Sequence, residues 1–149
     1  MKYKKYIYII ITLLGICLIF SFSLYDAQAS SVMSDKVGQI ILERFPFIAE
    51  HVPGDLVANF GLNIRKWAHF IEFFVLGVFV YLIFRQTVVR HKILVAFALC
   101  VLVGVMDESI QCFIDGRTSQ FSDVLIDSFG GFVGIVIGKC LPRKLHENK

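Results

Sequence analysis

The sequence has few charged residues. Lys, Arg, Asp and Glu make up 18% of the 149 residues, whereas 56% are hydrophobic and the mean hydropathy is +0.70. Soluble domains contain about 25% charged residues, so this shortage excludes an ordinary soluble domain. The net charge is only +3, and most basic residues lie in short runs beside apolar stretches, which excludes nucleic acid as a partner.

Cysteine pairs at metal-binding or redox spacing are also missing. The four cysteines, at positions 17, 100, 112 and 140, contain no CxxC pair, and most fall inside apolar stretches. Cysteine behaves there as a small hydrophobic residue, which excludes a disulfide framework and a cysteine-based metal site. The sequence contains no internal repeat either. We predict no cofactor and no metal site from its motifs.

Long hydrophobic runs, by contrast, are abundant. A membrane-spanning helix needs about 20 mainly apolar residues, and four stretches qualify, at about 6–24, 67–84, 93–114 and 124–141. The remaining long segment, 25–65, connects the first two. We therefore predict an all-α integral membrane protein, a four-transmembrane-helix bundle forming one domain over residues 1–149.

The basic residues predict how this bundle is oriented. Ten of the fifteen Lys and Arg lie in the N-terminus, the loop 85–92 and the C-terminal tail. Because basic residues concentrate in cytoplasmic segments, we predict that both termini are cytoplasmic. Segments 25–65 and 115–122 then face outward, and we expect the protein in a bacterial cell membrane.

The N-terminus permits an alternative. MKYKK, an apolar run and the small residues from Ala27 to Ser30 imitate a secretory signal peptide. The run from Tyr6 to Leu24 has 19 residues, whereas the apolar region of a signal peptide has about 7–15. We favour a first helix that is retained.

The outward segment 25–65 is too apolar for a free linker. Ser34 is predicted to cap a short helix that ends at Pro46, and Asp55 to cap a second one that includes Phe60. These amphipathic helices either lie on the membrane surface as packing elements or form a lid over a site beneath them.

The second hydrophobic run begins with KWAHFIEF, which puts costly polar residues into a membrane helix. At about 1.5 Å per residue, a helix that enters at Lys66 places His69 about 5 Å and Glu72 about 9 Å below the surface. Ionisable residues inside membranes usually face the bundle interior and are functional. We interpret all three as site residues.

The third hydrophobic run places further polar residues at a similar depth below the outer surface. Residues 93–106 give about 21 Å of helix, which is shorter than about 30 Å of hydrocarbon, so we expect the helix to continue to residue 114. Asp107 and Glu108 then lie about 8 Å below the outer surface, with Gln111 one turn above Asp107.

The fourth run adds two carboxylates above a glycine stripe. Asp123, Asp127, Gly130, Gly134 and Gly138 fall on one arc of about 80° on a helix. Small residues at every fourth position let helices pack closely. We therefore predict that this face packs against a neighbouring helix and carries both aspartates into the bundle.

The polar residues of three helices thus meet in one layer, with Arg117 above them in the loop. Five carboxylates against three basic groups leave an excess of negative charge, so some are protonated or a cation joins them. The predicted ligand-binding residues are Lys66, His69, Glu72, Asp107, Glu108, Gln111, Arg117, Asp123 and Asp127.

Three stretches resemble the VanZ-like membrane proteins associated with teicoplanin resistance. They are RKWAHFIEFFVLG (65–77), DESIQCFIDGRTSQFSDVLIDSFGGFVG (107–134) and, less closely, FSLYDAQASSVMS (22–34). The resemblance spans nearly the whole chain. It implies four helices, a place in the bacterial cell envelope and, in some members, a link to glycopeptide resistance, but no mechanism.

Two functions compete. The outer-leaflet pocket either binds a lipid-linked envelope component or a lipophilic glycopeptide, or it is an intramembrane transferase or hydrolase acting on such a lipid. The enzyme would use His69 as a base held by Glu72, with Asp107 or Glu108 as further catalytic candidates. No Ser or Cys is paired with His69 as a nucleophile. A metal-assisted variant stays open, because one His and several carboxylates can bind a divalent ion, although the spacing matches no recognised metal motif. A proton-coupled carrier would need an oligomer, because the inner half is apolar.

Overall fold

The computed structural model is helical, as its apolar runs predict, and it describes residues 2–51, 53–54, 60–117 and 120–142. No strand occurs within these ranges. Four helices are long and apolar enough to cross a membrane, which confirms the predicted fold class. The helices are α1 (Lys2–Ser23), α2 (Ala27–Arg44), α3 (Pro46–His51), α5 (Phe60–Phe84), α6 (Lys92–Gln111) and α7 (Phe121–Cys140).

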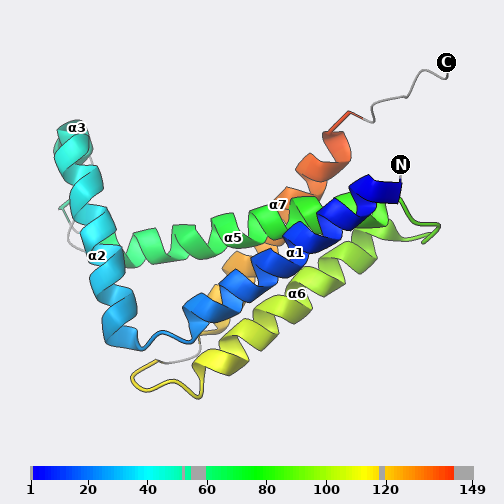
Figure 1. Ribbon diagram of the computed structural model, residues 1–149. Helices are drawn as coiled ribbons and strands as arrows, with labels where there is room; N and C mark the ends of the chain where they lie inside the picture. Colours follow the sequence, from blue (N-terminus) through cyan, green and yellow to red (C-terminus); the bar gives the residue numbers. More distant parts are fainter. Residues whose placement is uncertain (1, 52, 55–59, 118–119, 143–149) are drawn as a thin grey trace.

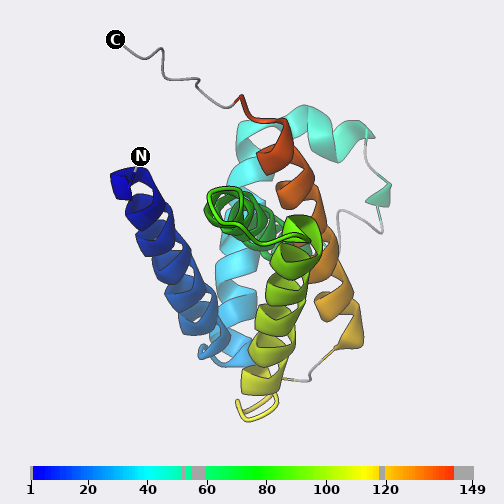
Figure 2. The same ribbon diagram turned by 90° about the vertical axis from the view of Figure 1, so that its right-hand side faces the viewer.

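The long helices α1, α5, α6 and α7 form a bundle, and α2 lies across one end of it (Figures 1 and 2). The start of α1, the α5–α6 connection and the last turn of α7 share the opposite end. We call the end with the α1–α2 connection and the α6–α7 loop the polar end. Helix α2 packs against α5 there.

Glycines bring α5 and α7 close together. A Cβ atom added at Gly134 would lie 2.0 Å from the carbonyl oxygen of Phe74, and one at Gly130 would lie 2.5 Å from that of Phe70. Gly138 is close to the backbone of Val78. Small residues permit such approach in membranes, where van der Waals packing drives helix association. The pairing fixes the height of α7 relative to α5, and with it the heights of Asp127 and His69.

The apolar core lies below the polar end. It contains Phe73 and Val80 of α5, Cys100 of α6 and Ile135 of α7, each fully buried. Helix α1 is the least embedded of the four, with 17% of its apolar window buried against 33–39% for the others. Its many exposed Leu, Ile and Tyr side chains are what a lipid-facing helix requires.

Several predicted boundaries differ from the structure. The third helix ends at Gln111 rather than at residue 114, because the chain turns from Cys112 to Gly116, whose positive φ of 73° favours glycine. The second begins at Phe60 instead of 67, and the fourth at Phe121 instead of 124. Polar residues at these ends pair within the bundle, so hydropathy alone misplaces them.

The prediction for segment 25–65 is partly wrong. Helix α2 is capped by Asp26, whose carboxylate accepts the backbone N–H of Ala29 at 2.6 Å, and Ser34 lies inside the helix. As predicted, the helix stops just before Pro46: it ends at Arg44, and Pro46 begins the next helix, α3. The proposed cap at Asp55 lies outside the described residues.

Candidate functional site

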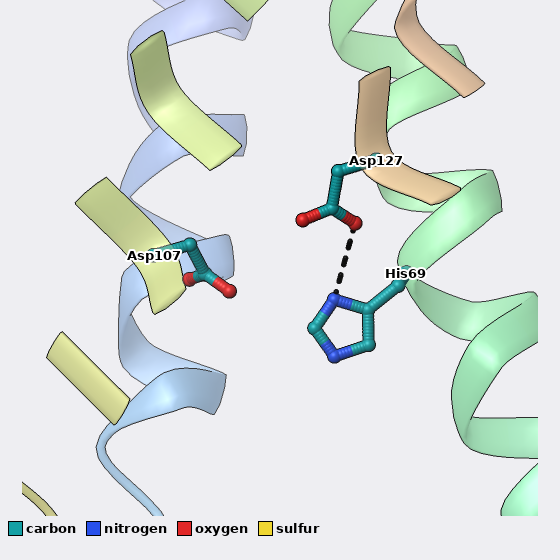
Figure 3. A group of neighbouring side chains, drawn as sticks. All are labelled: His69, Asp107 and Asp127. Carbon is teal, nitrogen blue, oxygen red and sulfur yellow. Dashed lines mark ion pairs between the residues drawn. The ribbon is translucent and has the colours of Figure 1, made fainter. Parts of the chain in front are cut away.

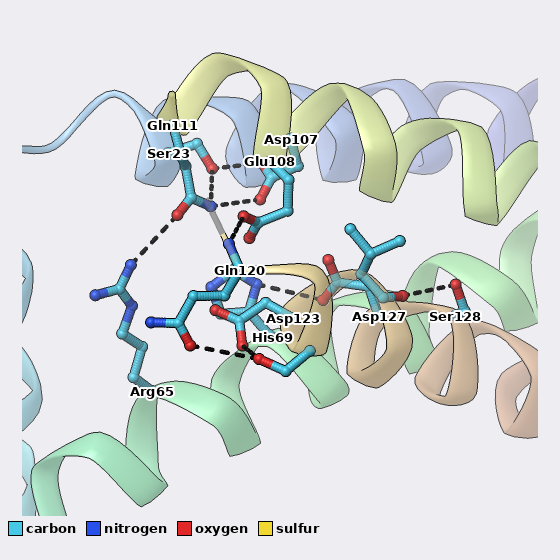
Figure 4. A network of polar contacts seen from close by, with 12 residues as sticks. Ser23, Arg65, His69, Asp107, Glu108, Gln111, Gln120, Asp123, Asp127 and Ser128 are labelled. Carbon is cyan, nitrogen blue, oxygen red and sulfur yellow. Dashed lines mark hydrogen bonds and ion pairs between the residues drawn. The ribbon is translucent and has the colours of Figure 1, made fainter. Parts of the chain in front are cut away.

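Polar side chains from four helices meet in the interior at the polar end (Figure 4). Asp107 and Asp127 are 0% exposed, and Gln111 is 1% exposed. Burying a polar group without a partner costs about 1–3 kcal/mol in proteins, so the contacts that these groups make are informative. The described residues satisfy some of them and leave others unsatisfied.

Asp107 is held by a network that joins α1, α5 and α6. The Ser23 hydroxyl donates to Asp107 Oδ1, and Gln111 Nε2 donates to Asp107 Oδ2 at 2.9 Å. Gln111 Nε2 also reaches the Ser23 oxygen at 3.3 Å, and Arg65 Nη2 donates to Gln111 Oε1 at 3.3 Å. Each oxygen of Asp107 therefore has a donor that fixes its orientation.

Glu108 and Asp123 organise the entry of α7. The backbone N–H of Gln120 donates to Glu108 Oε2 at 3.0 Å, and the Ser122 hydroxyl donates to Asp123 Oδ1 at 3.2 Å. Glu108 is 3% exposed. Both carboxylates accept hydrogen bonds from the first residues around the helix start, where negative groups are favourable. They anchor the loop end of α7 beside the site.

His69 and Asp127 form the central pair. His69 Nδ1 lies 3.3 Å from Asp127 Oδ1, whereas we had expected Glu72 to hold this histidine. Neither atom makes a hydrogen bond, and both oxygens of Asp127 lack a hydrogen-bond partner among the described residues. Asp107 faces the same space from α6 (Figure 3).

A cavity of about 170 Å³ opens beside this pair. Helix α2 forms one wall, so the segment does more than rest on the membrane surface. Serine hydroxyls and charged groups share the lining with apolar residues. The polar lining residues are Ser23, Tyr25, Ser30, Ser34, Arg65, His69, Glu72 and Arg117.

Two guanidinium groups line this cavity, and among the described residues neither lies within 4.0 Å of a carboxylate. The Nε–H groups of Arg65 and Arg117 are buried and have no hydrogen-bond partner in the same ranges. Burial and then the charge of Arg65 lower the pKa of Arg117 from its ordinary value, and the more distant Asp107, Glu108 and Asp26 offset part of this. Within the part of the chain that the structure describes, Arg117 Nη2 donates to the carbonyl oxygen of Phe22, at 3.5 Å. The two cations repel each other, and an anion between them would relieve that repulsion.

The comparisons with known proteins identify the family. The VanZ/LLP1 family model matches residues 7–142, nearly the whole chain. The chain belongs to the VanZ/LLP1 family. Its four spanning helices make this member a multi-pass membrane protein. No curated protein and no solved structure matches it.

The predicted site residues of this VanZ/LLP1 chain differ in where they lie relative to the cavity. His69, Glu72 and Arg117 line the cavity, and Asp107, Gln111 and Asp127 lie beside or beneath it. Lys66 does not join them. It is exposed and lines a separate groove with Trp67, Leu125 and Phe129 on the outside of α5 and α7.

Two residues of the site were missing from the predicted set. Arg65 lines the cavity in place of its neighbour Lys66, because consecutive residues lie about 100° apart on a helix. The sequence indicates this role of Arg65 only through its spacing: His69 and Glu72 follow four and seven residues later, which puts all three on one face of the helix. Ser23 gives no comparable signal, since a serine that ends an apolar run is common at any membrane surface.

Proposed function

We propose that the cavity binds the phosphate-bearing headgroup of a lipid-linked envelope component in the outer leaflet of a bacterial cell membrane. The observation that carries this proposal is the pair of guanidinium groups, Arg65 and Arg117, that line one cavity with serine hydroxyls and form no ion pair within 4.0 Å among the described residues. Arginine presents a planar fork of donors that matches phosphate oxygens. Serine hydroxyls add neutral donors and acceptors for sugar or glycerol hydroxyls.

The position of the cavity supports a lipid rather than a soluble ligand. The cavity lies where spanning helices α1 and α5 meet α2, and it includes apolar residues such as Ile19, Phe22 and Met33. A headgroup that entered here would keep its acyl chains beside exposed apolar side chains of α1. With the predicted orientation, in which both termini are cytoplasmic, this end faces outward.

Binding of this kind offers a route to glycopeptide tolerance. A protein that sequesters or repositions a lipid-linked envelope component changes what a lipophilic glycopeptide of the teicoplanin type meets at the membrane. The same cavity would also accept the anionic or hydroxyl groups of the glycopeptide itself. Resistance in this member is part of the proposal and follows only if such binding occurs.

Native mass spectrometry of protein extracted from its own membranes tests the proposal. We expect a co-purified lipid that contains phosphate. Arg65→Gln should lower its occupancy about tenfold or more, because a hydrogen bond to a charged group contributes about 1.5–3 kcal/mol. Lys66→Gln is the matched control, since the neighbouring side chain faces a different groove. Equal occupancy in both variants and wild type would overturn the proposal.

Two additions identify the ligand more closely. Inorganic phosphate at millimolar concentration should displace the lipid weakly, because it lacks the acyl chains. Complete displacement would assign the site to free phosphate. Displacement by teicoplanin at micromolar concentration would show that the glycopeptide competes for this cavity.

A second candidate function is hydrolysis or group transfer on the same lipid. The observation that favours it is the pair of His69 and Asp127 at 3.3 Å, beside the cavity that His69 and Glu72 line. A carboxylate this close favours the imidazolium that forms when His69 accepts a proton from water or a hydroxyl. Purified protein incubated with its co-purified lipid should then form a product. His69→Ala should abolish turnover while the lipid stays bound.

A further inference from the structure

Three side chains from three different helices converge beneath the cavity. Ligand atoms of His69 on α5, Asp107 on α6 and Asp127 on α7 all lie within 4.8 Å of one another (Figure 3). One imidazole and two carboxylates are the donors that Zn²⁺ and Mn²⁺ accept. The three residues are spread over 58 positions and share no sequence motif, which explains why spacing predicted no metal site.

Asp127 provides an independent sign that a ligand belongs here. Its side chain is 0% exposed and faces the other two residues, and neither of its oxygens receives a hydrogen bond from a described residue. A buried carboxylate that accepts no hydrogen bond is costly. Gly104 leaves room for it, because a Cβ atom at that position would lie 3.3 Å from the Cβ of Asp127. The packing thus keeps this carboxylate in place while no described residue supplies it with a hydrogen-bond donor.

The distance between His69 and Asp127 is also a sign that a ligand belongs here. Nδ1 and Oδ1 are 3.3 Å apart and do not form a hydrogen bond. Two ligands bound at about 2.0–2.1 Å to a tetrahedral ion lie about 3.3–3.4 Å apart. The two atoms are not aligned for a hydrogen bond, and their distance suits two ligands of one cation.

Asp107 accepts hydrogen bonds of the kind that usually orient a metal ligand. Ser23 and Gln111 donate to its two oxygens, which fixes the carboxylate while each oxygen retains a lone pair. Such outer hydrogen bonds typically orient metal ligands. A cation would also offset the negative charge that Asp107 and Asp127 bring into the bundle.

We infer that His69, Asp107 and Asp127 bind a divalent transition-metal cation, with the remaining coordination position open to the cavity. The sequence motifs alone predicted no metal site but left open that a cation joins the carboxylates, and this inference names the residues that would hold it. Three protein ligands and one open position are typical of catalytic rather than structural zinc sites. The cation does not require the lipid, so this inference stands apart from the proposed function.

Metal analysis of the purified protein provides the test. Protein purified without chelator, then incubated with Zn²⁺ or Mn²⁺ and desalted, should retain about one ion per chain by mass spectrometry. Asp127→Asn and His69→Ala should each reduce the amount of metal retained per chain at least tenfold. Asp123→Asn is the matched control, because that carboxylate lies one turn away on the same helix and accepts from Ser122. It should retain the ion.

A second measurement guards against variants that fail to fold. Zn²⁺ or Mn²⁺ should raise the melting temperature of the wild-type protein, because a ligand that binds only the folded state stabilises it. Wild-type protein that retains no ion and shows no such increase would overturn the inference, as would equal loss of metal in Asp123→Asn and Asp127→Asn. Arg65→Gln should lose lipid yet retain metal, which separates failure of this inference from failure of the lipid proposal.

Discussion

At the scale of single residues, the site depends on which way neighbouring side chains face. Arg65 and Lys66 are adjacent and both basic, yet Arg65 lines the cavity and Lys66 lines a groove on the opposite side. Their different surroundings follow from the turn of the helix, about 100° per residue. Hydropathy and charge are therefore insufficient to select the ligand-binding residue between them.

Ser23 offers a first test at this scale. Its hydroxyl donates to Asp107 and accepts from Gln111, both buried. Ser23→Ala should destabilise the protein by about 1–3 kcal/mol, because it leaves a buried acceptor short of one donor. Ser21→Ala should be nearly silent, since Ser21 is exposed and donates to the carbonyl of Cys17 on its own helix. Melting temperatures in detergent measure both, and equal effects would contradict the network.

Arg117 offers a second test. A lysine at this position keeps the charge but loses the planar fork that meets two phosphate oxygens. Arg117→Lys should therefore lower lipid occupancy in native mass spectrometry by about tenfold, while the amount of folded protein stays close to wild type. A variant that binds lipid as well as wild type would show that Arg117 acts as a simple point charge.

His69 and Glu72 test whether the polar layer is functional or structural. If these residues only anchor the helix at the membrane surface, His69→Ala and Glu72→Gln should be nearly silent. We expect each to abolish the cellular phenotype while expression and the melting temperature of the metal-free protein remain near wild type. The assay needs a strain in which deletion changes glycopeptide susceptibility, and full activity in both variants would remove these residues from the site.

At the scale of helices, the α5–α7 pair determines the site's geometry. The two helices approach through Gly130, Gly134 and Gly138, whose small size lets backbone pack on backbone. Asp127 lies one turn from Gly130 and is thereby held at the height of His69. The glycine spacing indicates a packing face from the sequence, but it does not indicate which helix packs there.

Adding a methyl group to a glycine of α7 tests how closely α5 and α7 pack. Gly134→Ala puts a Cβ atom about where the carbonyl oxygen of Phe74 lies, so the helices must separate, at a cost of about 1–3 kcal/mol. Gly15→Ala in α1 is the control, because nothing lies within 4 Å of its added Cβ. That control should be neutral or slightly stabilising, since alanine favours helices. Equal melting temperatures for the two variants would contradict close packing.

The helices themselves were predictable, whereas the ends of several were not. Four apolar runs of sufficient length determine four spanning helices whatever their partners. The boundaries depend on tertiary contacts: Gln111 ends α6 while paired with Ser23 and Arg65, and Asp26 rather than Ser34 caps α2. The partner of His69 also depends on the α5–α7 packing, which lies beyond the reach of sequence spacing.

At the scale of the whole molecule, the buried carboxylates of the described residues all lie at the polar end of the bundle. The opposite end carries the basic residues near the start of α1, in the α5–α6 connection and in the last turn of α7. This asymmetry predicts a single orientation in the membrane, with the cavity outside.

Single-cysteine labelling tests the orientation. In a background without the four native cysteines, a membrane-impermeant thiol reagent should label position 36 in intact cells and position 88 only after permeabilisation. Both positions are exposed in the structure, at α2 and in the α5–α6 connection, so the reagent can reach them. The reverse pattern would place the cavity in the cytoplasm and contradict an outer-leaflet ligand.

The outer side of α6 has a consequence for the surrounding bilayer. Leu102, Val105 and Met106 are exposed on the outside of the bundle, and Ser109, one turn after Val105, is exposed too, with its hydroxyl donating to the Val105 carbonyl. Because its own backbone satisfies this hydroxyl and the exposed Phe113 follows it, the outer side of α6 suits hydrocarbon up to the end of the helix even though its inner side is polar. The protein should therefore melt at a higher temperature in vesicles with hydrocarbon about 30 Å thick than in markedly thinner ones.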